Sequence, residues 1–185
     1  MILARLARQS RDDTIRSLYG VIVAQARHPL FYAAYGVPET LDGRFDMIVL
    51  HLCLVMRRLR SGSSEVRAVS QRLFDLFCSD MEHNLREIGV SDLSIPKEMR
   101  RLGEAFYGRA GAYDRALDAG EEAALAAVLG RNVFAEDGPP AQVLWLAAYV
   151  RKVEGQLALQ EPAELARGIL RWPEPGESGA IAAVE

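Results

Sequence analysis

One stretch of the chain constrains its fold more than any other. Between Arg44 and Leu59 nearly every residue is apolar, and the run ends on Arg57, Arg58 and Arg60. A helix that is apolar almost all round has to be enclosed by neighbouring elements, and basic residues suit its carboxyl end because they complement the helix dipole. The sequence therefore predicts a central helix here, surrounded by other helices.

The rest of the chain shows helical periodicity, and with 50% apolar residues it can bury a sizeable core. We expect a first helix that begins near Asp12 or Asp13 and ends at His28-Pro29, then one short helix plus a loop up to Gly43. Further helices are predicted from Ser63 to Gly89, from Ser94 to Gly120, and over residues 121–134, 141–159 and 162–170. These segments predict an all-α fold, a single compact domain of about seven helices over residues 1–171, followed by a flexible tail over residues 172–185.

Charge is distributed unevenly along the chain. The net charge of −3 gives no reason to expect nucleic-acid binding, but residues 1–72 carry +5 and residues 73–185 carry −8. If this separation persists in the fold, the arginine-bearing part faces an anionic membrane and the acidic remainder faces away. The alternative is that the charges mix on every face.

The first eleven residues have the composition of a membrane-surface helix. If helical, they set Leu3 and Leu6 apart from Arg5, Arg8 and Arg11. Such a pattern suits peripheral contact with an anionic membrane surface, and the alternative is a frayed or docked terminal helix.

The cellular compartment is predicted from apolar runs and cysteines. The longest apolar stretches, residues 48–56 and 143–150, are far shorter than the ~20 residues that span a bilayer. Cys53 and Cys78 lie in apolar surroundings with no signal peptide before them, which favours buried thiols in a reducing compartment. We therefore expect a cytoplasmic protein whose only membrane contact is peripheral.

Candidate catalytic groups are few. His51 lies in the most apolar helix, where a hydrogen-bonded core imidazole is the preferred interpretation. Asp80, His83 and Glu87 share a helix face and could supply metal ligands, but no second copy of the pattern exists, so a salt-bridged face is preferred. No nucleotide-binding loop or nucleophile motif is present, and we expect neither a cofactor nor an enzyme.

Two blocks of the sequence match a known family in residue type and order. The first runs from Tyr19 to His51 and includes Arg27-His28-Pro29, Gly36-Val37-Pro38 and Gly43-Arg44-Phe45. The second runs from Phe74 to Tyr113 and includes Asp80-Met81-Glu82, Asn84-Leu85-Arg86 and Pro96-Lys97-Glu98-Met99. Together they cover roughly residues 12–120 and resemble the ubiquinol-cytochrome c chaperone family, in particular its shorter bacterial-type members.

The resemblance implies a non-catalytic assembly factor. Members of this family bind newly made cytochrome b as a client protein and assist the assembly of respiratory complex III. Mitochondrial members work with a small partner protein near the ribosome exit. The rival hypothesis is a small helical enzyme or ligand-binding protein with a pocket or metal site among its helices.

A chaperone of this kind needs a helical groove lined by flexible and aromatic side chains, with polar groups that fix the orientation of the client. For Met81 and Phe106 core packing is the preferred alternative, and for the polar set it is pairing between helices. The aromatic residues between Pro29 and Pro38 are expected at a surface, because loops lie there. The candidate client-binding residues are Phe31, Tyr32, Tyr35, Asp80, Met81, Asn84, Arg86, Lys97, Phe106, Arg109 and Tyr113.

Overall fold

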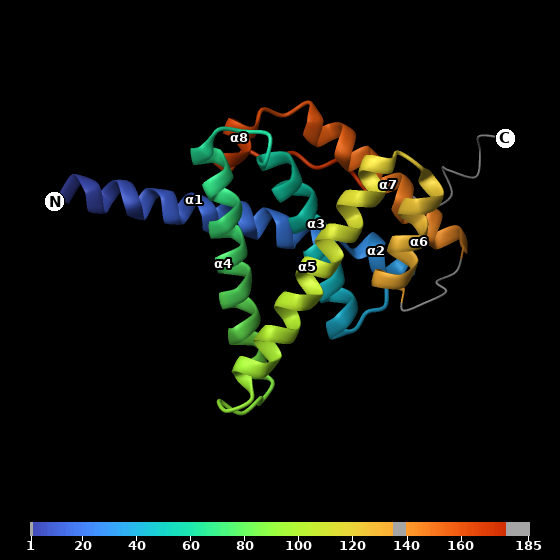
Figure 1. The fold of residues 1–185 in the computed structure, drawn as a ribbon, viewed down its shortest axis with the longest axis horizontal. Coiled ribbons are helices and arrows are strands. Elements are labelled where there is room, and N and C mark those ends of the chain that lie inside the picture. Colours follow the sequence, from blue (N-terminus) through green and yellow to red (C-terminus); the bar gives the residue numbers. More distant parts are fainter. Residues whose placement is uncertain (1, 135–139, 177–185) are drawn as a thin grey trace.

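A computed structural model describes the backbone of residues 2–134 and 140–176, and the side chains of residues 12–134 and 141–176. All regular structure in these ranges is helical, which confirms the predicted all-α domain of about seven helices (Figure 1). Two of the elements, α2 and α8, have only five residues each. The helices are α1 (Ile2–Ala26), α2 (Pro29–Ala33), α3 (Leu41–Leu59), α4 (Ser64–Glu87), α5 (Ile95–Ala119), α6 (Glu122–Val133), α7 (Pro140–Ala158) and α8 (Pro162–Ala166).

The predicted central helix is α3, which packs against α1, α4, α5, α6, α7 and α8. Its residues Val49, Leu50 and Leu52 are completely buried, and each such side chain contributes about 1.5–3 kcal/mol through the area it removes from water. The helix begins three residues before the predicted start because the Thr40 hydroxyl caps it, accepting a hydrogen bond from the Gly43 amide at 3.1 Å.

The first helix is longer than predicted. It begins at Ile2, so Asp12 and Asp13 lie inside α1 and do not cap its start. Asp12 instead forms an ion pair with Arg72 of α4, while Asp13 lies 3.9 Å from Arg16 one turn along. Inside the helix, Asp12 therefore has a partner on another helix, and Asp13 has a neighbour on its own helix. The predicted end is confirmed, because α2 begins at Pro29 and His28 occupies its N-cap position.

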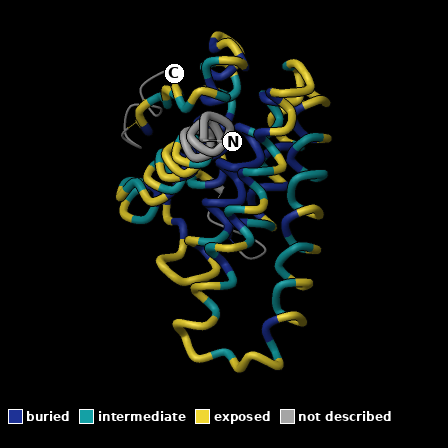
Figure 2. The backbone as a smooth tube through the Cα atoms, turned by 90° about the vertical axis from the view of Figure 1, so that its left-hand side faces the viewer, coloured by how far each residue is buried: buried dark blue, intermediate teal, exposed yellow. Residues whose placement is uncertain are grey.

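Helices α4 and α5 form a long hairpin whose far end projects from the rest of the molecule (Figures 1 and 2). The predicted stops at Gly89 and Gly120 are confirmed, since both glycines have a positive φ, of 87° and 73°. The tip is exposed: Leu93 keeps 95% of its surface in water and Ile88 keeps 59%.

The two differently charged parts of the sequence meet in the fold. Arg57 of α3 forms ion pairs with Asp114 at 3.4 Å and with Asp118 at 2.6 Å, both on α5. Arg60 also pairs with Asp114. These contacts favour the alternative in which charges mix on each face over a separation into a basic and an acidic side.

The C-terminal segment, residues 170–176, lies against the helices. The Gln160 side chain fastens its start: the amide nitrogen donates to the Arg171 carbonyl at 2.9 Å, and the Arg171 amide donates back to the Gln160 carbonyl oxygen at 2.8 Å. Trp172 then lies over His51, and the Tyr35 hydroxyl donates to the Gly176 carbonyl. Residues 172–176, which begin the expected tail, therefore contact the helical domain. The rest of that tail, residues 177–185, lies outside the described residues.

Candidate binding groove

The aromatic residues of α2 and the following turn lie in the core. Phe31 and Tyr35 are 0% and 1% exposed, so the expectation that they lie at a surface is wrong. The single turn of α2 folds their rings inward against α7, with ring centroids 4.8 Å apart for Phe31 and Tyr149. Tyr32 is half-buried, and its hydroxyl donates to the Ala26 carbonyl at 2.9 Å.

His51 lies in the same core and is a hydrogen-bonded imidazole, as predicted. Its Nδ1 lies 2.8 Å from the Met47 carbonyl, which can only accept, so Nδ1 carries the proton. Its Nε2 therefore accepts from the Tyr149 hydroxyl at 2.9 Å, and Gln25 donates to that hydroxyl oxygen at 3.0 Å. Complete burial lowers the pKa of His51 to about 4, which keeps the ring neutral.

The apolar candidates from the second sequence block also lie in the core. Met81 is 9% exposed, and Phe106 and Tyr113 are each 1% exposed. Phe106 packs against Phe77 of α4, with ring centroids 5.5 Å apart. These three side chains therefore pack in the core, which is the alternative stated for the apolar candidates.

Two of the polar candidates are engaged within the fold. The Asp80 carboxylate accepts a hydrogen bond from the Tyr19 hydroxyl at 2.9 Å. Arg109 lies 2.7 Å from the nearly buried Asp46 carboxylate and 5.6 Å from the centre of the Phe45 ring. Burial raises the pKa of Asp46 to about 6, and the Arg109 charge opposes this rise.

The remaining polar candidates lie on the exposed hairpin. Asn84 and Arg86 belong to α4 and Lys97 to α5, and all three are exposed. Arg86 forms ion pairs with Glu82, four residues before it on α4, at 2.8 Å and with Asp92. All three residues are therefore accessible on a projecting part of the molecule, and Arg86 is already paired there.

The alternative metal site is not assembled. Asp80 is bonded to Tyr19, whereas His83 Nε2 lies 3.5 Å from Glu87 at the surface. Among the residues whose placement is described, no group of three His, Cys, Asp or Glu side chains could hold a metal ion. Burial raises the pKa of the Cys53 thiol to about 12, so it is not a thiolate nucleophile at neutral pH.

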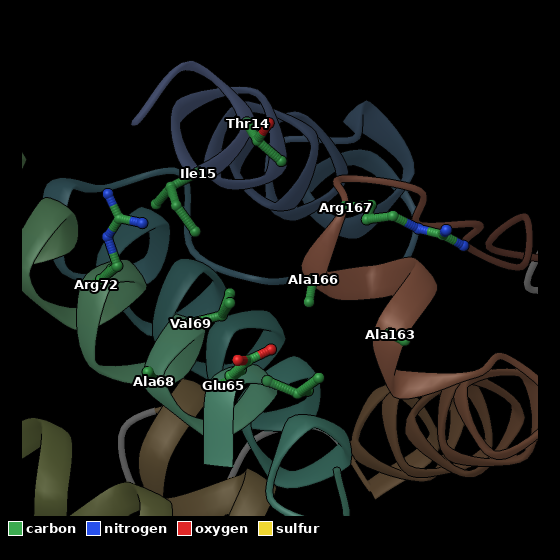
Figure 3. A pocket seen from close by; sticks show the side chains of 10 residues that line it. Thr14, Ile15, Glu65, Ala68, Val69, Arg72, Ala163, Ala166 and Arg167 are labelled. Carbon is green, nitrogen blue, oxygen red and sulfur yellow. The ribbon is translucent and has the colours of Figure 1, made fainter. Parts of the chain in front are cut away.

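A groove that the sequence did not reveal lies between α1, α4 and α8 (Figure 3). It has a volume of about 1050 Å³, and a second, separate hollow of about 280 Å³ that reaches Leu76 shares Ile15 and Arg72 with it. Its lining consists of small and apolar side chains with charged residues at the edges. The lining residues of the larger hollow are Thr14, Ile15, Glu65, Val66, Ala68, Val69, Arg72, Ala163, Ala166 and Arg167.

Two close approaches fix α8 as one wall of this groove. A side chain on Gly62 would come within 3.1 Å of Pro162 at the start of α8, and Gly168 just after α8 has a φ of +83° and abuts Thr14. Leu165, between them, is fully buried. The groove stays open because Ala68, Ala163 and Ala166 are too small to fill it. The positions of these alanines form no sequence pattern that would have predicted the groove.

The candidate membrane-contact residues Leu3, Arg5, Leu6, Arg8 and Arg11 belong to the first turns of α1, and their side chains lie outside the described residues. Within the described part of the chain, no helix has the length and apolar content needed to cross a membrane.

Comparisons with known proteins extend the sequence resemblance. The family model described as "Ubiquinol-cytochrome C chaperone" matches residues 33–172. "Ubiquinol-cytochrome-c reductase complex assembly factor 1" from Xenopus laevis is 24% identical over 136 residues, which cover 73% of this chain and 68% of that protein. The crystal structure of the Cbp3 homolog from Brucella abortus superposes with a TM-score of 0.84 at 37% identity and covers 95% of this chain and 98% of the other.

Proposed function

This chain belongs to the ubiquinol-cytochrome c chaperone family, and we propose that it is a non-catalytic chaperone that binds newly made cytochrome b during the assembly of respiratory complex III. The observation that carries the proposal is the family match over residues 33–172, together with a fold shared with the Brucella abortus protein. The name of the Xenopus laevis relative, a complex III assembly factor, supports the same role.

The chemistry of the described residues agrees with a binding role. His51 is fully buried with both ring nitrogens hydrogen-bonded, and burial raises the pKa of the Cys53 thiol to about 12, so neither group is available to a substrate. The accessible features include an open groove and a projecting hairpin that carries Asn84, Arg86 and Lys97. Both offer surface to a polypeptide, which supports the proposed binding role.

Deletion of the gene tests the proposed function. We expect the deletion strain to lose most of its cytochrome b and assembled complex III, measured by reduced-minus-oxidised haem spectra and by native gel electrophoresis. A plasmid copy of the gene restores both, whereas levels of another respiratory complex stay unchanged. Normal complex III in the deletion strain would contradict the proposal.

We also propose peripheral contact between the first turns of α1 and the cytoplasmic face of the membrane. The support is the sequence pattern of Leu3, Leu6, Arg5, Arg8 and Arg11 within a helix that begins at Ile2. Replacing the three arginines by glutamine should reduce flotation with anionic liposomes at low salt. The matched control replaces Arg67, Arg100 and Arg101, which are exposed elsewhere on the molecule. Equal flotation of both triple variants would refute the contact.

A further inference from the structure

We infer that the groove between α1, α4 and α8 binds one amphipathic helix of the client, taken from its water-exposed cytoplasmic part, with a basic residue facing Glu65. The inference rests on the proposed function, because it takes the client to be a membrane protein. It assigns a binding surface that none of the sequence motifs indicated.

The shape of the groove fits a helix. Along α4 the larger hollow is lined from Glu65 to Arg72, where the ion pair between Arg72 and Asp12 crosses from α4 to α1. Between these residues the α4 wall advances about 10 Å, which equals two turns of a bound helix. A helix laid in an open groove buries one face and leaves the other in water.

The lining decides which kind of helix fits. The lining includes the apolar side chains of Ile15, Val66 and Val69. Figure 3 shows Ile15 and Val69 at the hollow, with the small side chains of Ala163 and Ala166 on α8 opposite. A membrane-spanning helix is apolar on all sides and would keep much of its apolar surface in water here. An amphipathic helix places its apolar face on this lining and its polar face outward.

Charge defines the polar flank of the occupant. Arg72 is neutralised by Asp12, and the Arg167 side chain points away from the hollow in Figure 3. Glu65 is exposed at the groove and has no ion-pair partner among the described residues. A basic residue of the client complements this carboxylate. Cytoplasmic segments of membrane proteins next to their spans carry an excess of Lys and Arg, so they supply such residues.

The groove exists before binding. Gly62 and Gly168 let α8 approach its neighbours at both ends, and buried Leu165 anchors it to the core. A binding site that is already formed loses little conformational entropy when the partner arrives. A client helix can therefore enter without a rearrangement of α8.

Synthetic peptides test the inference on the full-length protein. Fluorescein-labelled peptides that together cover cytochrome b of the same organism, with the spanning segments in mild detergent, are titrated with protein and followed by fluorescence anisotropy. We expect binding of an amphipathic peptide with a basic flank. Ala68→Trp, which fills the groove, should weaken this binding at least tenfold, while Ala123→Trp on the exposed face of α6 leaves it unchanged.

Several results would overturn the assignment: equal affinity of the Ala68→Trp and Ala123→Trp proteins, binding of the spanning peptides alone, or no binding of any peptide. A photo-cross-linker placed at Ala68 in cells should form an adduct with cytochrome b. An adduct with a second copy of this chain, or with a different protein, would also overturn it.

A charge exchange gives a second measurement that does not depend on filling the groove. Glu65→Lys should weaken the peptide roughly threefold to tenfold, and a peptide with its basic residue changed to Glu should regain affinity for this variant. Glu122→Lys on α6 is the matched control and should change nothing. Failure of the exchanged peptide to regain affinity would contradict the assigned orientation.

Failure of this inference and failure of the proposed function give different results. If the deletion strain keeps normal complex III, the chaperone role itself is refuted. If the deletion strain loses complex III but the Ala68→Trp gene restores it fully and its protein binds every peptide normally, the chaperone role stands and the client binds elsewhere.

Discussion

The C-terminal part of the chain packs tightly against the helices in one region and leaves an open groove in another. Over α2, α3 and α7, Trp172 covers His51 with ring centroids 5.2 Å apart, and the space is filled by aromatic rings. Beside α1 and α4, α8 presents Ala163 and Ala166, and a groove of about 1050 Å³ remains. Large aromatic side chains fill the first, closed region, whereas the alanines of the second leave it open.

The polar groups of the two regions differ in whether they have partners within the protein. In the closed region His51, Tyr149 and Gln25 form a continuous chain of hydrogen bonds. In the groove Glu65 faces water. A buried polar group that loses its partner costs stability, whereas an exposed one turns to solvent. Substitutions should therefore have large effects in the closed region and small effects in the groove.

The largest effect is expected for Phe31→Ala in the closed region. Phe31 is fully buried against Tyr35, His51 and Tyr149, so its removal leaves a cavity and should lower the free energy of unfolding by about 3–5 kcal/mol. Urea denaturation measures this change. Leu159→Ala, at a position 83% exposed, is the control and should change stability by less than about 0.5 kcal/mol. A similar loss of stability in both variants would contradict the special importance of the closed region.

The next effect is a pH dependence. Because burial lowers the pKa of His51 to about 4, the unfolded chain binds a proton between pH 6.5 and 4 that the folded chain does not bind. Stability should fall as the pH decreases through this range, and the loss due to His51 is on the order of 3 kcal/mol.

Comparison with His51→Gln isolates that loss. Urea denaturation of both proteins at several pH values should give a stability difference that shrinks as the pH falls from 6.5 to 4. Asp46, whose pKa is raised to about 6, acts in the opposite direction, but it is present in both proteins and cancels. A difference that stays constant with pH would contradict the assignment.

Tyr149→Phe should have an intermediate effect. The change keeps the ring but leaves His51 Nε2 buried without its donor, which should cost about 1–3 kcal/mol. The same measurement on Tyr107→Phe, at a position 62% exposed on α5, should show almost no change. If the two variants were equally stable, the Tyr149 hydrogen bond would contribute nothing.

Gly168→Ala tests how firmly α8 is held as a wall of the groove. A side chain at a φ of +83° is strained and would lie 3.4 Å from Thr14, so we expect a loss of about 1–2 kcal/mol and faster amide hydrogen exchange in α8. Gly155→Ala in α7 meets nothing within 4 Å and should instead stabilise the protein by about 0.5–1 kcal/mol. Unchanged exchange in α8 would show that Gly168 does not position this wall.

The smallest effect is expected for Ala68→Trp in the groove. The side chain enters open space and displaces only water, so the free energy of unfolding should change by no more than about 0.5 kcal/mol. A thermal melt followed by circular dichroism checks this. A large loss would mean that the groove is narrower than its lining indicates.

The sequence predicted those parts of the fold that depend on local signals. The apolar run of α3, the proline at the start of α2 and the glycines that end α4 and α5 each specify a structure within a few residues. His51 was correctly interpreted because a lone imidazole on an apolar helix needs only hydrogen-bond partners. Fold class and helix order followed from these signals.

Features that depend on distant contacts were not predictable. Asp12 resembles a helix cap until Arg72, sixty positions away, is known to pair with it. Phe31 and Tyr35 resemble surface loop residues until Tyr149 covers them. The groove has the weakest signal of all, because it results from the absence of large side chains at positions on two helices far apart in the sequence, α4 and α8.

The two hydrogen bonds between Gln160 and Arg171 have a consequence for how the groove wall is held. They join the two ends of residues 161–170 and make that stretch, which contains α8, a closed loop. Leu165 in the middle of this stretch is fully buried, so the groove wall is fixed to the core at its centre as well as at its two ends.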